Sequence, residues 1–316
     1  MNELGTVFNA VLPVFLVVGA GFALRRLNWL NAVADASLLK ITINLLIPCL
    51  AFDSLLGNQA FVRAGNVFLP PLVGFGTVGL GLLLAAAVRR WVPARTEGTR
   101  RTFVFCTAVY NYGYLPIPLA MTLFNRETVG VLFVHNVGVE IAFWIFGLML
   151  LAGAGLRTSG RRLLNAPLLT IAATLLLNLL IRRDQVPAAV LNAAHMVGQC
   201  AIPLGMMLIG ATIADHVGEF RVHRGARAIA LGCLLRLGVL PLLFLLLARV
   251  LPASVELKRV IVIQAAMPSA VFPIVLVRHY GGDPATALAV VMSTSIAGLL
   301  TIPLWLQIGF RLAGLG

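Results

Sequence analysis

Two short segments inside long apolar runs combine helix-breaking residues with polar groups that could hold a small ligand. One is Asn111–Pro118, with the sequence NYGYLPIP, and the other is Met267–Pro273, with the sequence MPSAVFP. Each proline removes a backbone donor and clashes with the preceding turn, so neither run can continue as a regular helix. In hydrocarbon a broken helix survives only where protein or water covers its unpaired backbone groups. We therefore expect the two breaks to meet in a polar site.

The ends of helix fragments at such breaks carry unpaired N–H or C=O groups, and N–H ends favour anions. We expect free N–H groups at one break and free C=O groups at the other, with Gly113 permitting close backbone approach. The alternative is a pair of proline kinks, with Gln264 and Thr294 bonded to the backbone of their own helices. The residues expected to line the site are Asn111, Tyr112, Gly113, Pro116, Pro118, Gln264, Met267, Pro268, Ser269, Pro273 and Thr294.

Charged residues inside apolar runs are candidates for coupling or substrate attraction. Glu140 lies near the middle of its run, with Asn136 one helical turn earlier on the same face, and at that depth its carboxyl could carry a proton. Arg236 could form an ion pair with Glu140 or attract an anionic substrate. Asp53 falls near the end of its run, where we expect exposure at the membrane interface, and His195 is expected to be structural.

The composition identifies the class of protein. Of 316 residues, 60% are hydrophobic and 11% are charged, against roughly 25% charged in a soluble domain. This balance indicates an all-α polytopic membrane protein. The net charge of +13 lies in arginine clusters between apolar runs, which favours membrane topology and lipid headgroups over nucleic acid. No cofactor motif, metal-ligand spacing or nucleophile paired with a base is present, so we expect no enzyme.

Ten membrane spans are predicted, and alternate loops between them share a side of the membrane. Loops after the odd-numbered spans carry fourteen arginines, and the other side carries eight basic residues, termini included. Because positive charge stays in the cytoplasm, both termini are predicted to lie outside it, in a bacterial inner membrane. The predicted spans are residues 6–24, 37–56, 66–88, 102–123, 128–154, 166–181, 188–214, 228–249, 260–277 and 285–309.

The spans repeat once. Pro48 and Pro203 lie 155 residues apart, and so do Pro118 and Pro273. Five spans repeated once must insert in opposite directions, as in many secondary transporters. We therefore predict a 5+5 inverted repeat, 1–154 and 166–316, with broken helices four and nine crossed. Pro48 and Pro203 themselves are interpreted as simple kinks, with a hinge or gate as the alternative.

Taken together, these motifs resemble those of the auxin efflux carrier family, in its bacterial branch, over nearly the whole chain. The strings that carry the resemblance are Leu45–Pro48 with Phe52, Asn111–Pro118, Ala201–Leu204 with Gly210–Ala211, Ala265–Ser269 with Tyr280–Gly281, and Ser293–Ser295 with Pro303–Leu304. The bulky Tyr112 and Tyr114, and Glu140, depart from the usual pattern.

The resemblance implies a ten-helix fold like that of bile acid and sodium/proton carriers, with helices four and nine crossing. It implies that helices one, two, six and seven form a scaffold, through which a homodimer could form, while helices three to five and eight to ten move as a transport domain. It also implies organic anions, such as malonate- or malate-like acids, as substrates.

The expected function is a secondary carrier of a small organic anion, working by elevator-type alternating access, with a proton coupled through Glu140. Two alternatives stay open. One is a sodium-coupled carrier of bile acid-like anions, which would need several carboxylates and amides around a cation. The other is a receptor or sensor that binds a ligand at the crossover without moving it.

Overall fold

The computed structural model describes residues 3–93, 96–152, 164–219 and 222–315, and its regular elements are all helices. The first half of the chain contains α1 (Glu3–Arg26), α2 (Ala32–Ile41), η1 (Thr42–Leu46), α3 (Ile47–Leu55), η2 (Gln59–Val62), α4 (Gly65–Val88), η3 (Arg89–Trp91), α5 (Glu97–Ala108), α6 (Pro116–Leu123) and α7 (Arg126–Ala152). The second half contains α9 (Ala166–Leu180), η4 (Arg183–Gln185), α10 (Ala188–Gln199), α11 (Ala201–His216), η5 (Val217–Glu219), α12 (Val222–Leu234), η6 (Leu235–Val239), α13 (Leu240–Val250), α14 (Val255–Ala266), α15 (Phe272–His279) and α16 (Pro284–Leu312).

Within the described residues, seven helical segments are long and apolar enough to cross a membrane, and α9 is a shorter apolar helix. The predicted all-α membrane class is thereby confirmed. The remaining two predicted spans, 102–123 and 260–277, are each divided between two short helices, so neither contains one long helix. Outward-facing leucines such as Leu179 and Leu300, with 81% and 82% of their surface exposed, suit contact with lipid rather than water.

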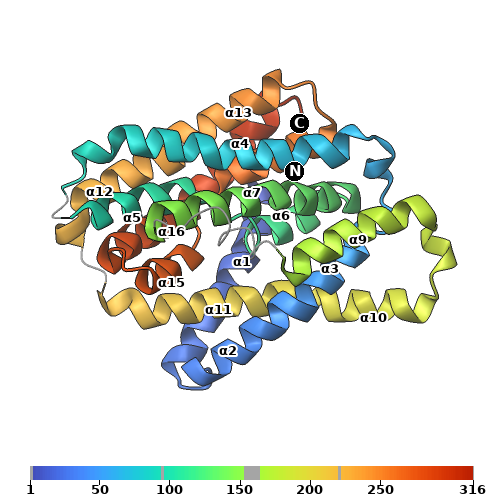
Figure 1. The fold of residues 1–316 in the computed structure, drawn as a ribbon, viewed down its shortest axis with the longest axis horizontal. Helices are drawn as coiled ribbons and strands as arrows, with labels where there is room; N and C mark the ends of the chain where they lie inside the picture. Colours follow the sequence, from blue (N-terminus) through green and yellow to red (C-terminus); the bar gives the residue numbers. More distant parts are fainter. Residues whose placement is uncertain (1–2, 94–95, 153–163, 220–221, 316) are drawn as a thin grey trace.

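The helices form an elongated bundle with α6 and α7 between its two long edges (Figure 1). In this view α4 and α13 lie along one edge, while α2, α10 and α11 lie along the opposite edge. The packed pairs include α1 with α11, α3 with α9 and α10, α4 with α7, and α12 with α16. Each of α5, α7 and α14 contacts at least two other long helices, which places the central segments between the edges.

Prolines at the second pair of predicted kinks do not divide their spans. Pro48 follows the π turn η1, and Ala32–Leu55 continues as one membrane-length helix. Pro203 lies in the first turn of α11, which follows α10 after the single residue Cys200, and Ala188–His216 likewise counts as one span. A proline in the first turn of a helix lacks only an N–H that would have no partner there. The interpretation of both prolines as kinks therefore fits the structure.

Two helix pairs approach one another through glycine. A Cβ atom added to Gly138 on α7 would lie 1.7 Å from the carbonyl oxygen of Pro71 on α4, and one on Gly210 of α11 would lie 1.9 Å from that of Val18 on α1. No real side chain fits at such distances. The backbones of these pairs are therefore in direct contact, as small residues permit in membrane helices.

Five arginines that contribute to the charge asymmetry of the loops lie outside the described residues, so their placement is not tested: Arg95, Arg157, Arg161, Arg162 and Arg221.

Candidate functional site

The two predicted breaks meet. After α5 ends at Ala108 and after α14 ends at Ala266, the chain is extended, and the two extended segments pair through an antiparallel bridge between Tyr110 and Ser269. The N–H of Asn111 donates to the carbonyl of Pro268 at 2.8 Å, and the N–H of Ala270 donates to that of Val109 at 3.0 Å. Each break thus supplies backbone partners that the other has lost, which is the condition for a broken helix in hydrocarbon.

Side-chain amides from two further helices converge on the carbonyl of Tyr112. Asn136 on α7 donates to it from Nδ2 at 2.7 Å, and Gln264 on α14 donates from Nε2 at 3.2 Å. The same Nε2 also lies 3.1 Å from Oδ1 of Asn136. His135 approaches that Oδ1 through Nδ1 at 3.3 Å. Gln264 was expected to line the site, whereas Asn136 was expected to act with Glu140. Both belong to this network, which connects the first break to α7 and α14.

Asn111 is buried, and the N–H₂ group of its side-chain amide makes no hydrogen bond among the described residues. Its Oδ1 accepts a hydrogen bond from the N–H of Leu115, the residue before α6, at 3.3 Å. Among the described residues no acceptor lies within hydrogen-bond distance of its Nδ2. The amide N–H₂ is therefore available to a ligand oxygen.

The second break is held by α16. The N–H of Ser269 donates to Oγ1 of Thr294 at 3.3 Å, while the Thr294 hydroxyl bonds to carbonyls of its own helix. Met267 is fully buried. In the described part of the chain, Oγ of Ser269 and Oε1 of Gln264 are buried polar atoms without a hydrogen-bond partner. Buried groups of this kind are rare and indicate a water or a ligand at the site.

The prolines begin the second helix fragments rather than kink continuous ones. Pro116 is the first residue of α6, and Pro273 is in the first turn of α15. Because Pro116 and Pro118 have no N–H and Ile117 donates to the carbonyl of Gly113 at 3.0 Å, the start of α6 offers little to an anion.

The expected division, with N–H ends at one break and C=O ends at the other, is wrong. Each break has both, because each joins the C-terminal end of one helix to the N-terminal end of the next. The start of α15 has more free N–H groups than the start of α6. There the N–H groups of Val271 and Phe272 have no acceptor among the described residues.

Gly113 is not required for close packing in this conformation. A Cβ atom added there would meet no other atom within 4 Å, and its φ is not positive. The expected close approach of another backbone is therefore not seen. Instead, Gly113 faces open space beside the network at Tyr112.

Arg236 is fully buried and does not form an ion pair with Glu140. Its guanidinium lies 5.0 Å from the ring centre of Tyr110 and 5.2 Å from that of Phe244. Nη2 lies 3.5 Å from the carbonyl of Ala265, near the C-terminal end of α14. In the described residues no carboxylate pairs with Arg236, and its Nε and Nη1 have no hydrogen-bond partner. A buried cation without a counter-ion, directly behind the bridged Tyr110, gives the site a positive charge.

Glu140 is instead bonded to the start of α9. Its Oε1 accepts from Nδ2 of Asn165 at 2.5 Å and from Nε1 of Trp144 at 3.4 Å. Asn165 also caps α9, because its Oδ1 accepts from the N–H of Leu168 at 3.0 Å. Glu140 therefore connects α7 to α9.

Asp53 is not the exposed interface residue that its position predicts, since only 14% of its side chain is exposed. Its two carboxylate oxygens pair with Arg183 and His195, each at 2.8 Å. Its backbone carbonyl also accepts from Arg126 at the start of α7. This network joins α3, α7, η4 and α10. It gives Asp53 and His195 structural partners remote in sequence.

One functional candidate, Tyr110, escaped the sequence reasoning. Tyr110 is fully buried at the bridge, and its hydroxyl lies 2.8 Å from Oγ1 of Thr77 on α4. Tyr110 directly precedes the Asn111–Pro118 segment, but a tyrosine in an apolar run carries no sequence signal that separates it from a lipid-facing one. Only the doubled break, with an extended strand at its centre, could have pointed to it.

Comparisons with known proteins relate the chain to membrane transport proteins. A family model described as membrane transport protein matches residues 6–161 and 163–306. An uncharacterized transporter of Methanothermobacter thermautotrophicus is 27% identical over 94% of this chain and 96% of its own length. One of Methanocaldococcus jannaschii is 22% identical over 94% and 97%, and the yeast protein ECM3 is 30% identical over 28% of this chain and 15% of its own length. The chain belongs to the auxin efflux carrier family and is a membrane transport protein.

Proposed function

We propose that the protein is a secondary carrier of a small organic anion, such as a mono- or dicarboxylate, which binds where the two broken helices cross. The observation that supports this most directly is the crossover itself. It brings together the spare N–H₂ of Asn111, the buried Ser269 hydroxyl, which has no hydrogen-bond partner, and the uncompensated charge of Arg236. A carboxylate would satisfy donors and charge together.

The crossing also supports the ten-helix 5+5 inverted repeat. In that plan α5 with α6 forms helix four, and α14 with α15 forms helix nine. Packing of α1 against α11 corresponds to packing of α9 against α3, and α4 with α7 corresponds to α12 with α16. The arginine-rich loops then face the cytoplasm, both termini lie outside it, and the membrane is the bacterial inner membrane.

The proposed movement is an elevator-type displacement of helices three to five and eight to ten against a scaffold of helices one, two, six and seven, through which two copies could associate. Glu140 bears on this proposal because its bond to Asn165 runs from helix five to helix six, across the boundary between the two groups. A bond in that place must break when the groups slide. Protonation of the carboxylate would weaken it, which is how a proton could be coupled to transport.

Counterflow in liposomes tests the proposal. The full chain is reconstituted, loaded with unlabelled anion, and supplied with a labelled trace of the same anion, after a thermal-shift screen of short dicarboxylates, monocarboxylates and indole acids. A carrier accumulates label transiently, whereas a receptor binds without accumulation.

The matched variants for this assay are Asn111→Ala and Asn44→Ala. Asn44 is an exposed asparagine whose side chain bonds only within its own helix, to the carbonyl of Lys40. Loss of counterflow in Asn111→Ala with normal counterflow in Asn44→Ala supports the site. Unchanged counterflow in Asn111→Ala removes the site assignment.

A further inference from the structure

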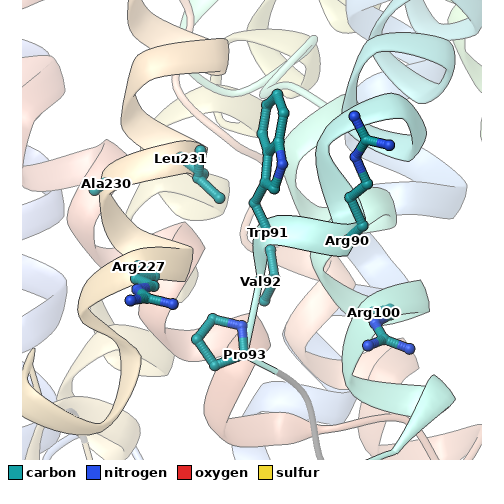
Figure 2. A pocket seen from close by; sticks show the side chains of 8 residues that line it. All are labelled: Arg90, Trp91, Val92, Pro93, Arg100, Arg227, Ala230 and Leu231. Atoms are coloured by element: carbon teal, nitrogen blue, oxygen red, sulfur yellow. The ribbon is translucent and has the colours of Figure 1, made fainter.

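An open, basic pocket lies well away from the crossover, at the ends of three helices. Its volume is about 710 Å³, within the usual range of roughly 300–1,000 Å³ for ligand sites. It is formed by η3 and the residues after it, by the first turn of α5 and by the second and third turns of α12 (Figure 2). The lining residues are Arg90, Trp91, Val92, Pro93, Arg100, Arg227, Ala230 and Leu231.

The pocket sits at a membrane boundary. The apolar run of α4 ends at Val88 and is followed at once by Arg89, Arg90 and Trp91, while the membrane-length segment that contains α12 begins at Ala226, next to Arg227. Arginine and tryptophan directly after an apolar span are typical of the headgroup level of a bilayer. Both walls of the pocket therefore reach the same depth.

Its charge is strongly unbalanced. Among the described carboxylates, Glu97 forms the ion pairs next to the pocket, and it is shared by Arg89 at 3.1 Å, Arg100 at 3.7 Å and Arg101 at 4.0 Å. Arg90 and Arg227 pair with none of the described carboxylates. The Nε of Arg100 is buried without a hydrogen-bond partner. An anion with several oxygens is the ligand that such a group of guanidinium donors binds.

The apolar part of the lining separates a lipid from a free anion. Trp91 is 54% exposed, and Figure 2 shows its ring standing between the Arg227 side and the Arg90 side of the pocket, with Leu231 opposite. A free phosphate would use only the arginines. A phospholipid would place its phosphate among the arginines and its glycerol and acyl region along Trp91 and Leu231.

We propose that this pocket is a binding site for the headgroup of an acidic phospholipid. The bound lipid bridges the end of α4, the start of the broken helix α5 and the start of α12, which come from the two halves of the chain. Because it contacts none of the crossover residues, the site does not depend on the nature of the transported anion.

The test measures lipid retention by native mass spectrometry of the full chain in detergent, with phosphatidylglycerol and phosphatidylcholine offered in equal amounts. We expect the unaltered protein to retain phosphatidylglycerol preferentially. The double substitution Arg100→Gln with Arg227→Gln should weaken that preference at least about tenfold. Arg227→Lys alone, which preserves the charge, should keep most of it.

Arg249→Gln is the matched control, because Arg249 is exposed at the opposite end of the same membrane segment, Ala226–Val250. A preference lost equally in Arg249→Gln, or no preference in the unaltered protein, overturns the proposal. Competition by millimolar inorganic phosphate as effective as that by phosphatidylglycerol would show a free-phosphate site and would also overturn it. All these variants change exposed or half-exposed side chains, so folding can be verified by thermal unfolding.

Discussion

Asn136 donates from Nδ2 to the carbonyl of Tyr112 at 2.7 Å, so a side chain of an unbroken helix completes the hydrogen bonding of an interrupted one. Without Asn136 the carbonyl would keep only the longer bond from Gln264, at 3.2 Å, in a place where no water can replace the lost partner.

Asn136→Leu should therefore destabilise the protein and impair transport together. It leaves Tyr112 with the longer bond from Gln264 alone, and leaves the Gln264 amide without its second acceptor. A buried polar group left unsatisfied costs about 1–3 kcal/mol. We expect a lower midpoint of thermal unfolding in detergent and slower counterflow. A midpoint equal to that of Asn44→Ala would show that the network at Tyr112 carries no stability.

Arg236→Met should separate stability from function. Burial of a charge without a counter-ion is costly, and methionine replaces much of its volume, so we expect unchanged or increased thermal stability. Because the site loses its positive charge, the KM for an anionic substrate should rise at least about tenfold, equivalent to about 1.4 kcal/mol. An unaltered KM would show that Arg236 serves only to pack Tyr110 and Phe244.

Glu140→Gln should flatten the dependence of transport on pH if Glu140 carries the coupled proton. Glutamine retains an oxygen for the bond from Asn165, so α7 and α9 remain connected while the titrating group is removed. Counterflow is measured from acid to neutral pH in parallel with Asn165→Ala, which breaks the connection but keeps the carboxyl. If counterflow by Glu140→Gln depends on pH as it does in the unaltered protein, Glu140 does not carry the coupled proton.

Asp53→Asn should lower stability without changing substrate specificity. The substitution weakens two contacts at 2.8 Å, to Arg183 and His195, that connect α3 to η4 and α10. Since Arg183 and His195 are partly exposed, we expect a loss of about 1 kcal/mol rather than the larger cost of a buried pair. A double-mutant cycle with Arg183→Gln measures the coupling between the two. A cycle that sums to zero would contradict the role of this pair in stability.

Two glycines provide a paired test of packing. Gly138→Ala forces a Cβ atom to within 1.7 Å of the Pro71 carbonyl, so α4 and α7 must separate, at a cost of about 3 kcal/mol or more. Gly113→Ala adds the same atom where nothing lies within 4 Å. We expect greatly reduced expression of folded Gly138→Ala and a normal unfolding midpoint for Gly113→Ala. Equal stability of the two variants would contradict the close contact of α4 and α7.

The two breaks were predictable from the doubled pattern of proline and polar residues, since each proline removes a backbone donor. Proline alone does not end a helix, because Pro13, Pro70 and Pro303 lie inside α1, α4 and α16. Which residues pair across the two breaks was not predictable from the sequence. The bridge between Tyr110 and Ser269 depends on the register of two segments that are far apart in the chain, and nothing local distinguishes Tyr110 from a lipid-facing tyrosine.

The partners of the charged residues were also not predictable from the sequence. Depth along a helix can be counted from sequence, but its rotation about its own axis is set by neighbours. Glu140 and Arg236 were thus placed at suitable depths yet face Asn165 and Tyr110 rather than each other. For the same reason Asp53 was expected at the surface, although Arg183 covers it.

The glycine contacts bear on how the helix pairs of the proposed carrier could stay packed during the transport cycle. In the proposed scheme, the Gly138–Pro71 contact lies inside the moving group, and the Gly210–Val18 contact lies inside the stationary one. Backbone touching backbone resists shear, since neither surface has a side chain that can swing aside. Across the boundary, by contrast, Gly205 on α11 receives the ring of Tyr114, which can rotate. Rigid backbone contacts within each group, and a movable aromatic contact between the groups, would confine the proposed displacement to a single plane.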